Sequence, residues 1–470
     1  MEIWQELSRC ICLLRPASTR RATFGWLAII LAGMCARSDL AGVTSFVRAG
    51  WLLESCYPML LHFFNASTAI SASSLTVIWT GVASNLFTPL RLGGRAVCLA
   101  DGIKVAKEGK KMPGVKCLHN GSDNNSKPDF IMGHSFQTLS LLASAPTCQA
   151  FAVPLTARLG EGVVFTNRDK RTLLDKLATM FQEVAPLLGF GSMLLVADAY
   201  YASRKIILPL LAAGHHLVSR VRSNAVAYHP AVRPERPGRG RPRIYGRKIQ
   251  LSSIFKAPHA FKPMQSPVYG ETNVTLQYRC LDLVWRPVGA LVRFVLVIHP
   301  TRGKIIIIAT DTTMTAADIV LAYGLRFKIE VAYKQAVHTL GTFCYHFWMM
   351  AMKPVKRYSG NQHVHRASHS YRQSVRRKLE AYHRYVQMGC IAQGLLQHLA
   401  INFKDAVWRS FRSWMRTMKP DLVPSELVVS LALRSSLLEF LGVGPKDAEL
   451  RKILTDVSDP SRLPGSQMAA

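Results

Sequence analysis

The sequence predicts an α/β protein whose sheet domain is preceded and followed by helical regions. Strand-like and helix-like segments alternate between about residues 95 and 221, and this alternation is typical of α/β folds. The segment Met193 to Ala197 is apolar throughout, as in strands that helices cover on both faces. A chain of 470 residues, 49% of them hydrophobic, can bury a large core and form two to four domains.

An N-terminal helical domain is expected over residues 1–92, because apolar residues such as Leu27, Ile30 and Leu31 recur at helical spacing. The apolar run from Phe24 to Ala36 resembles a secretory signal. It is too short to span a bilayer, and it continues without a clear cleavage site, so we interpret it as a buried helix. Contact with DNA and simple packing both stay open as roles for this domain.

The first part of the sheet domain is expected over residues 93–221. Apolar periodicity marks the helix at 170–188, and Gly214 closes the helix that precedes the last strand. In chain order we predict strands at 95–100, 136–142 and 149–155, a helix at 170–188, a strand at 193–198, a helix at 204–213 and a strand at 216–221.

A basic β-rich insertion is expected over residues 222–290, which are rich in Pro, Gly and Arg and contain short alternating segments. Residues 291–350 then form the second part of the sheet domain. They include a helix at whose start Thr315 and Asp318 provide a capping signature. Strands are predicted at 292–298 and 305–309.

The C-terminal region, residues 351–455, is expected to be helical and basic. Between residues 353 and 384 there are nine Lys or Arg and one acid. We predict one long helix at 371–400 and another at 425–441. Residues 456–470 are rich in Ser, Pro and Gly, and we expect a flexible tail.

The charge of the chain points to an acidic partner. Lys and Arg number 59 against 28 Asp and Glu, which gives a net charge of +31. Such a field attracts polyanions and speeds their capture, so nucleic acid is the expected partner and an anionic membrane surface is the rival. The ten cysteines are scattered and form no CxxC, which disfavours a disulfide framework or a zinc finger and fits a reducing cytoplasm.

Two aspartates and a glutamate are the candidate catalytic residues. Asp101 and Asp198 each follow an apolar strand, and the carboxyl ends of strands are where α/β folds place their ligands. Glu330 lies on a later helix. Phosphodiester cleavage by two metal ions needs carboxylates on rigid elements, and hard oxygen ligands suit Mg²⁺ or Mn²⁺. An Asp after a strand is also a common turn former or helix cap, so neither Asp is specific alone.

The helix that carries Glu330 strengthens this reading. Tyr323, Arg326 and Glu330 are spaced three and four residues apart and therefore share one helix face, which Lys334 extends by a turn. Such a face can hold both a metal ion and DNA phosphates. A solvated face with an ordinary Arg–Glu pair is the alternative.

At these residues the chain resembles the DDE transposases of bacterial insertion sequences, most closely the insertion-sequence-four family, over about residues 95–400. Tyr323, Arg326 and Glu330 match the family signature Y-x2-R-x3-E-x6-K, and Val337 occupies the place of its lysine. Lys334, one turn earlier, is the candidate substitute. The segments 101–105, 125–134 and 196–201 also resemble the family's motifs.

The resemblance implies a ribonuclease-H-like catalytic domain interrupted by a β-rich insertion. It implies an endonuclease that uses Mg²⁺, with Mn²⁺ as a substitute, to cut transposon ends, form a hairpin on the excised end and join it to target DNA. Asp101, Asp198 and Glu330 would be the catalytic metal ligands, and Tyr323 and Arg326 would hold phosphates. The implied partner is double-stranded DNA, bound by a synaptic homodimer on the nucleoid in the cytoplasm and not on a membrane.

Two basic segments are further candidates for DNA binding. Arg239, Arg241 and Arg243 lie in a Pro- and Gly-rich stretch that can lie extended in a minor groove. Arg376 and Arg377 begin the long C-terminal helix, where phosphate contacts are expected. A solvated basic surface is the alternative in both places.

Two other functions stay open. A non-catalytic DNA-binding remnant of a decayed transposase would explain Val337 at the lysine place. A membrane-associated basic protein would explain the positive charge. Nicking of DNA in the presence of Mg²⁺ separates the first of these from an enzyme, and cell fractionation tests the second.

Overall fold

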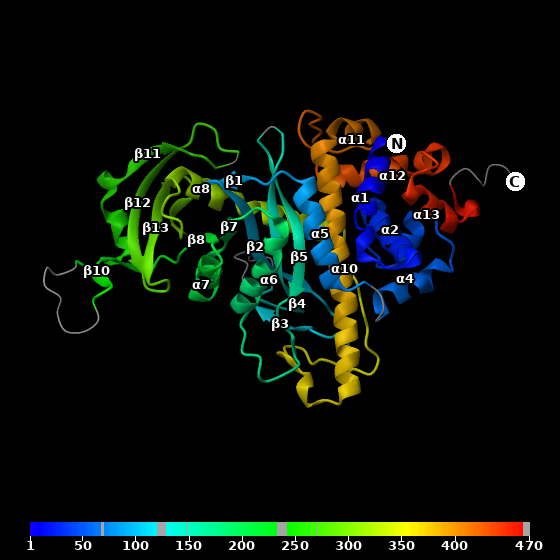
Figure 1. Cartoon of the computed structure of the whole chain (residues 1–470), viewed down its shortest axis with the longest axis horizontal. Helices are drawn as coiled ribbons and strands as arrows, with labels where there is room; N and C mark the ends of the chain where they lie inside the picture. The colour runs from blue at the N-terminus through cyan, green and yellow to red at the C-terminus, as the bar shows by residue number, and fades with distance from the viewer. Residues whose placement is uncertain (67–69, 120–127, 147, 233–241, 269, 464–470) are drawn as a thin grey trace. The chain divides into compact units, whose positions relative to one another are not determined.

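The computed structural model describes residues 1–66, 70–119, 128–146, 148–232, 242–268 and 270–463. The chain forms two compact units, which can be followed by colour in Figure 1. The first unit comprises Met1–Thr88, Gly102–Lys170 and Val331–Ala470, and the second comprises Pro89–Asp101 and Arg171–Glu330.

The second unit is built on a mixed sheet. Strand β7 (Met193–Ala197) pairs in parallel with β8 (His216–Arg220) and with the first half of β2 (Arg95–Ala106). On the other side of β8, β14 (Gly303–Ala309) pairs antiparallel. The sheet continues through β13 (Ala290–His299), β12 (Thr275–Trp285), β9 (Val226–Pro230) and β10 (Tyr245–Gln250), with β11 (Lys262–Gln265) beside β12 and β1 (Arg91–Leu92) beside β2.

Local signals explain the helices of this unit. Helix α6 (Leu173–Leu188) begins with a capping box, in which Thr172 Oγ1 accepts from Asp175 N and Thr172 N donates to an Asp175 carboxylate oxygen. It ends at Gly189, whose φ of 69° favours glycine. The other helices are α7 (Arg204–Ala212) and α8 (Ala316–Leu325), and α9 (Phe327–His338) starts in this unit.

The first unit is organised around α10 (His369–Asn402), a helix of 34 residues. From Ala381 to Ala400 nearly every side chain is buried. Gln387 Nε2 donates to the main-chain oxygen of Leu155 over 2.8 Å and so ties α10 to β5 (Ala150–Leu159). The other elements are α1 (Glu2–Cys12), α2 (Arg21–Ala36), α3 (Thr44–Ala49), α4 (Cys56–Asn65), α5 (Ala72–Leu86), α11 (Lys404–Ser410), α12 (Glu426–Val443), α13 (Glu449–Val457), β3 (Lys116–His119), β4 (Phe130–Ser144), β6 (Val163–Val164) and β15 (Gln362–His363).

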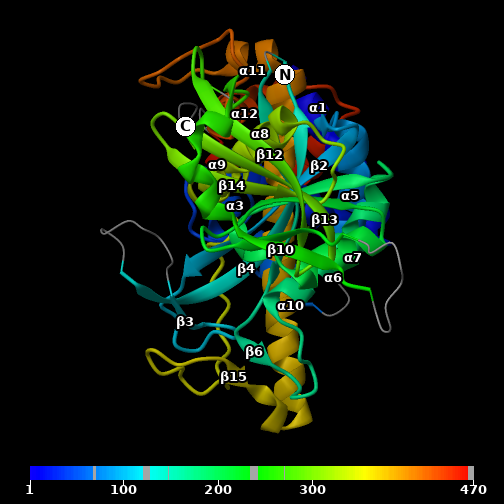
Figure 2. The ribbon, with the colours of Figure 1, turned by 90° about the vertical axis from the view of Figure 1, so that its left-hand side faces the viewer.

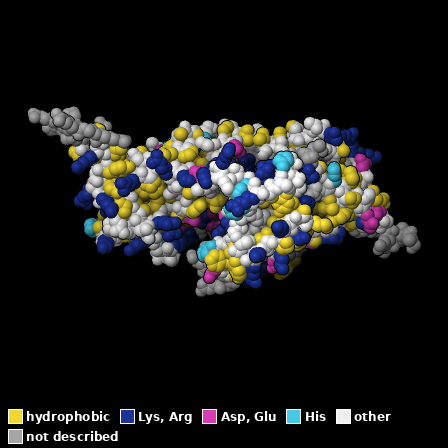
Figure 3. Space-filling model, turned by 90° about the horizontal axis from the view of Figure 1, so that it is seen from below, with side chains coloured by type: hydrophobic (Ala, Val, Ile, Leu, Met, Phe, Trp, Pro, Cys, Tyr) yellow, Lys and Arg dark blue, Asp and Glu magenta, His cyan; other side chains and the backbone are white. Residues whose placement is uncertain are grey.

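The N-terminal end of α10 is amphipathic. Val375 and Leu379 are buried in a small apolar cluster, and β6 and β15 lie beside this end of the helix (Figure 2). Arg376 and Arg377, on the same turns, are exposed. Lys and Arg side chains are spread over the face of the molecule in Figure 3, where acids are few, as the net charge of +31 requires.

The mixed α/β class predicted from the sequence is confirmed. The helix predicted at 371–400 is α10, and the strand predicted at 193–198 is β7. Strand β4 is longer than the predicted 136–142, because its first residues continue the pairing with β3 although they are not uniformly apolar. Over the residues described, every helix lacks either the length or the apolar character that a bilayer span needs.

Candidate active site

The sheet of the second unit places the two predicted aspartates side by side. In the parallel register of β2 and β7, Ala100 is the partner of Ala197. Asp101 and Asp198 are the next residues in the chain, and both are partly exposed. Asp198 directly follows β7 as predicted, whereas Asp101 lies within β2, which continues to Ala106 beyond the predicted strand end at residue 100. Because neighbouring strands lie about 4.8 Å apart, the two carboxylates leave the same edge of the sheet as close neighbours.

Glu330 reaches this region from a helix that differs from the predicted one. The sequence predicts a single helix from Thr315 past Glu330, whereas α8 ends at Leu325 and α9 begins at Phe327. The junction is tightened by bonds of the i to i+3 type, since Arg326 N donates to Tyr323 O and Ile329 N donates to Arg326 O. Glu330 lies in the first turn of α9.

Arg326 joins two of the three acids. Its Nη1 lies 3.1 Å from Asp101 Oδ2, and its Nη2 lies 2.5 Å from Glu330 Oε1. Only 17% of the Arg326 side chain is exposed, against 42% for Glu330. One guanidinium therefore holds a strand carboxylate and a helix carboxylate within hydrogen-bond distance of itself.

The third acid contacts the neighbouring tyrosine. Tyr323 donates a long hydrogen bond of 3.5 Å to Asp198 Oδ1, and the guanidinium carbon of Arg326 lies 5.9 Å from the centre of the Tyr323 ring. The structure thus brings Asp198, Tyr323 and Arg326 together with the other two acids. Contacts of Arg326 and Tyr323 therefore link all five residues predicted from the sequence, although the carboxylate oxygens of the three acids do not all lie within 4.8 Å of one another.

Burial and charge fix the ionisation of the two non-acidic members. Burial raises the pKa of Tyr323; Arg326 opposes this and Asp198 adds to it. Burial acts to lower the pKa of Arg326, but Asp101, Tyr323 and Glu330 outweigh it, so the pKa is raised. At neutral pH Tyr323 is therefore a neutral donor and Arg326 a cation.

The other predicted DNA-binding residues are exposed where the structure describes them. Lys334 is exposed on α9, and Val337, at the lysine place of the signature, is half-buried. Arg243 is exposed before β10, whereas Arg239 and Arg241 lie outside the described residues. The first residues of the motif at 125–134, up to residue 127, are also outside them.

The basic end of α10 borders a hollow within the first unit. Lys353, Lys356 and Arg366 are among the residues that line this hollow, which measures about 690 Å³. Arg376 is exposed, and its guanidinium carbon lies 4.7 Å from the ring centre of Phe165. The region therefore offers several groups that can bind phosphate.

A basic pocket next to Tyr323 and Arg326 escaped the sequence-based prediction. It measures about 330 Å³ within the second unit, and its cationic lining residues include Arg220, Arg302 and Lys304. Arg220 is the last residue of β8, the third parallel strand, and therefore leaves the sheet at the same edge as the two aspartates. The same strand-end rule that marked the acids could have marked this arginine.

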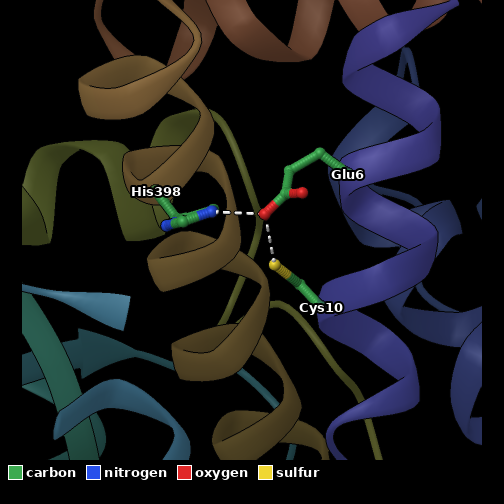
Figure 4. Close-up of side chains that lie close together, drawn as sticks. All are labelled: Glu6, Cys10 and His398. Carbon is green, nitrogen blue, oxygen red and sulfur yellow. Dashed lines mark hydrogen bonds and ion pairs between the residues drawn. The ribbon is translucent and has the colours of Figure 1, made fainter. Parts of the chain in front are cut away.

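A second polar cluster lies in the first unit and was not predicted. Figure 4 shows Glu6 between Cys10 and His398, with Glu6 Oε1 3.2 Å from Cys10 Sγ and 2.7 Å from His398 Nε2. Within the described part of the chain it is the one group of three His, Cys, Asp or Glu with ligand atoms mutually within 4.8 Å. Arg9 Nε also donates to Glu6 over 2.8 Å.

This cluster, the Glu6 brace, is a set of hydrogen bonds that links Glu6 and Cys10 on α1 to His398 on α10. Burial acts to raise the pKa of Glu6, but hydrogen bonds from Arg9, His398 and Cys10 outweigh it and lower the pKa to about 2. Burial raises the pKa of Cys10, with the Glu6 charge adding to the effect. A protonated thiol and a carboxylate already held by a guanidinium are a poor starting point for a metal site.

An α/β protein with two carboxylates where the pairing of parallel strands ends, and a third on a helix joined to them by one arginine, has the type of site found in metal-dependent nucleases. Comparison with protein families agrees with this class. Residues 13–279, more than half of the chain, match the family described as DDE superfamily endonuclease, and the chain belongs to that family. The match includes Asp101 and Asp198 and ends before Glu330.

Comparison with solved structures gives a weaker relation. A cryo-EM structure of the piggyBac transposase synaptic complex with hairpin DNA matches at 12% identity, over 99% of this chain and 84% of that chain. Its TM-score of 0.29 is too low to inform the fold or the site. No curated protein matches the sequence.

Proposed function

We propose that this endonuclease is a Mg²⁺-dependent DNA transposase of the insertion-sequence-four type, with Mn²⁺ as a substitute metal. In this proposal it cuts transposon ends and joins them to target DNA. The observation that carries the proposal is the convergence of Asp101, Asp198 and Glu330 on the Tyr323–Arg326 pair within one unit. These five residues are the ones that match the family's motifs.

The residues fit a divalent metal centre. Three carboxylates supply only hard oxygen ligands, which Mg²⁺ and Mn²⁺ prefer. They are partly exposed in a strongly basic protein, and Arg326 forms ion pairs with two of them. When bound, a pair of such ions activates the attacking water or hydroxyl and stabilises the leaving oxygen.

The protein's own groups position the DNA. Tyr323 and Arg326 can donate hydrogen bonds to phosphate oxygens, and Arg326 forms charge-assisted bonds that are shorter and stronger than neutral ones. Asp101 and Asp198 are rigid because their strands pair in a fully buried part of the sheet. Rigid placement matters, since small displacements of catalytic groups lower the rate steeply.

The basic surfaces extend the proposed DNA contact. Arg376 and Arg377 on α10 and Lys334 on α9 would bind phosphates, as would Arg243 in the insertion. We also propose the domain division given by the sequence, with a ribonuclease-H-like catalytic domain split by the insertion at 222–290. A synaptic homodimer on the nucleoid in the cytoplasm completes the proposal.

The test is a nicking assay with Mg²⁺ on DNA that carries the element's ends. Asp101→Asn, Asp198→Asn and Glu330→Gln should each reduce cutting by more than about 100-fold, because even partners of metal ligands contribute about 10–100-fold. DNA binding should persist in all three variants, since each removes a negative charge. The measurements are nicking rate and affinity for the same DNA.

Asp175→Asn is the matched control, because Asp175 is a carboxylate of the same unit that is engaged with Lys205 and Thr172. It should cut at the wild-type rate. Undiminished cutting by Asp101→Asn would refute the assigned site.

A non-catalytic DNA-binding remnant is the second candidate, and Val337 at the lysine place favours it. Such a remnant would bind DNA without nicking it under any metal condition. The variant Val337→Lys would restore the lysine of the signature. Recovery of nicking would then show that only this group had been lost, and continued absence of nicking would show a wider loss of function.

A further inference from the structure

Arg326 faces two chemically opposite environments. On one side its guanidinium bonds Asp101 and Glu330. On the other it belongs to the lining of the pocket of about 330 Å³, together with Arg220, Arg302 and other residues. A single side chain thus lies between the acids and a cationic pocket.

The pocket combines a basic rim with an apolar lining. Its aliphatic lining residues are Val268, Leu276, Val297, Ile305, Ile307 and Val320. Glu271, the acid bonded to Arg302 at 2.8 Å, already accepts from Ser266 and contacts His299. The described residues that line the pocket offer Arg326 positive neighbours and no carboxylate, so a group that drew Arg326 toward the pocket would have to be an anion from outside.

A guanidinium and a divalent cation cannot share the acids at this range. Arg326 lies at hydrogen-bond distance from Asp101 and Glu330, where a metal ion would also have to bind. Two cations a few ångströms apart repel strongly in a half-buried setting. Metal binding to these two carboxylates therefore requires the guanidinium to leave.

We infer that Arg326 is an exchangeable cation that couples metal binding to DNA binding. Without DNA it neutralises Asp101 and Glu330 and weakens their hold on metal. A DNA phosphate at the rim of the basic pocket draws Arg326 away and frees both carboxylates. By linkage the effect is reciprocal, so metal binding also strengthens phosphate binding. This inference rests on the proposed function of the acids.

The primary test is Mn²⁺ binding to the full chain without DNA, measured by titration calorimetry. Arg326→Gln should bind Mn²⁺ about 10-fold more tightly than the wild type, because the competing cation is gone. Arg326→Lys should fall between the two, since it keeps the charge but loses the two-pronged geometry. It also serves as the test variant if the glutamine variant does not fold.

Arg293→Gln is the matched control. Arg293 pairs with Asp282 at 2.7 Å in the same unit, a distance between those of the two Arg326 pairs, but does not bond the three acids in any described contact. Its Mn²⁺ affinity should equal that of the wild type. Unchanged or weaker Mn²⁺ binding by Arg326→Gln, with a wild-type fold by circular dichroism, would overturn the inference.

A second arm measures the coupling. Addition of a short DNA duplex should raise the Mn²⁺ affinity of the wild type several-fold more than that of Arg326→Gln. An equal increase in both would show that DNA supplies metal ligands itself and that Arg326 is not the link.

Asp101→Asn separates the two proposals. If it lowers Mn²⁺ affinity while Arg326→Gln has no effect, the metal site stands and the exchange role of Arg326 falls. If Asp101→Asn leaves Mn²⁺ affinity unchanged, the proposed metal site falls, and the exchange inference falls with it.

Discussion

Buried charges in the first unit are each satisfied by several partners. Arg384, 2% exposed, donates to the main-chain oxygens of Phe63, Phe64 and Ile70. Glu6 likewise accepts hydrogen bonds from a guanidinium, a ring nitrogen and a thiol. Multiple partners are needed because a buried charge left with one partner or none costs several kcal/mol.

The Glu6 brace should make stability depend on pH. The pKa of Glu6 is lowered to about 2 in the folded protein from 4.5, so its contribution is present above about pH 4.5 and is lost as the pH falls toward 2. Glu6→Gln should reduce stability by about 2 kcal/mol at pH 7, a value discounted for the exposure of Arg9. The thermal midpoint should fall by a few degrees at pH 7 and by less at pH 3.5.

Glu2→Gln is the control on the same helix, because Glu2 pairs with Arg409 at the surface. An exposed pair contributes little, so its midpoint should stay within about a degree of the wild type at both pH values. A loss for Glu6→Gln that is the same at pH 7 and pH 3.5 would contradict the lowered pKa.

Local sequence patterns predicted which residues belong to the candidate site but not which of them contact one another. A strand-end rule pointed to Asp101 and Asp198, although β2 in fact continues past Asp101 to Ala106, and the spacing to Tyr323 and Arg326 pointed to Glu330. The bond from Arg326 to Asp101 joins residues 225 positions apart, and no local pattern encodes that contact. The pair Glu6 and His398 is 392 positions apart and was missed for the same reason.

Elements were predicted well where one physical signal dominates. Strand β7 is apolar because it is buried along its whole length, and α10 is long and periodic. The short helices α11 and α13 were missed, since seven and nine residues give too little periodicity to separate from loop. The break between α8 and α9 was missed because Arg326 keeps helical dihedrals and only the hydrogen-bond pattern changes.

Helices α5 and α10 approach closely at one glycine, and this contact is testable. A Cβ added at Gly394 would lie 2.2 Å from the ring of Trp79, whose indole is fully buried and donates to Pro154 O over 2.8 Å. Gly394→Ala should therefore destabilise the protein by about 1–3 kcal/mol, as overpacking does. The measurement is the midpoint of thermal or urea unfolding.

Gly81→Ala, on α5 itself, is the matched control. No atom lies within 4 Å of a Cβ added there, so the higher helix propensity of alanine should raise stability by up to about 1 kcal/mol. Equal stabilisation by both substitutions would show that the two helices do not pack as described.

The chain carries more positive side chains than its acidic side chains can pair with. Fewer than half as many acids as bases are present, so most Lys and Arg have no carboxylate to pair with. The hollow lined by Lys353, Lys356 and Arg366 and the pocket beside Arg326 are among the places where this excess lines a concave surface. A polyanion would release counterions from such sites, which makes its affinity fall with salt.

The salt dependence of DNA binding tests whether the end of α10 contacts phosphates. Each phosphate contact contributes about 0.9 to the slope of log affinity against log salt. The double variant Arg376→Gln/Arg377→Gln should therefore reduce the slope by about 1–2 between about 50 and 200 mM salt. Fluorescence anisotropy with a short duplex measures it.

A control variant with the same net charge distinguishes direct phosphate contact from the effect of net charge on DNA binding. Arg48→Gln/Arg409→Gln removes two arginines of the same unit that already pair with Asp39 and Glu2, so it lowers the net charge equally. Its slope should match that of the wild type, because the slope counts phosphates neutralised in the complex and not the total charge of the protein. Equal reductions in both double variants would mean that the general field alone attracts DNA, and the basic end of α10 would lose its assignment as a contact surface.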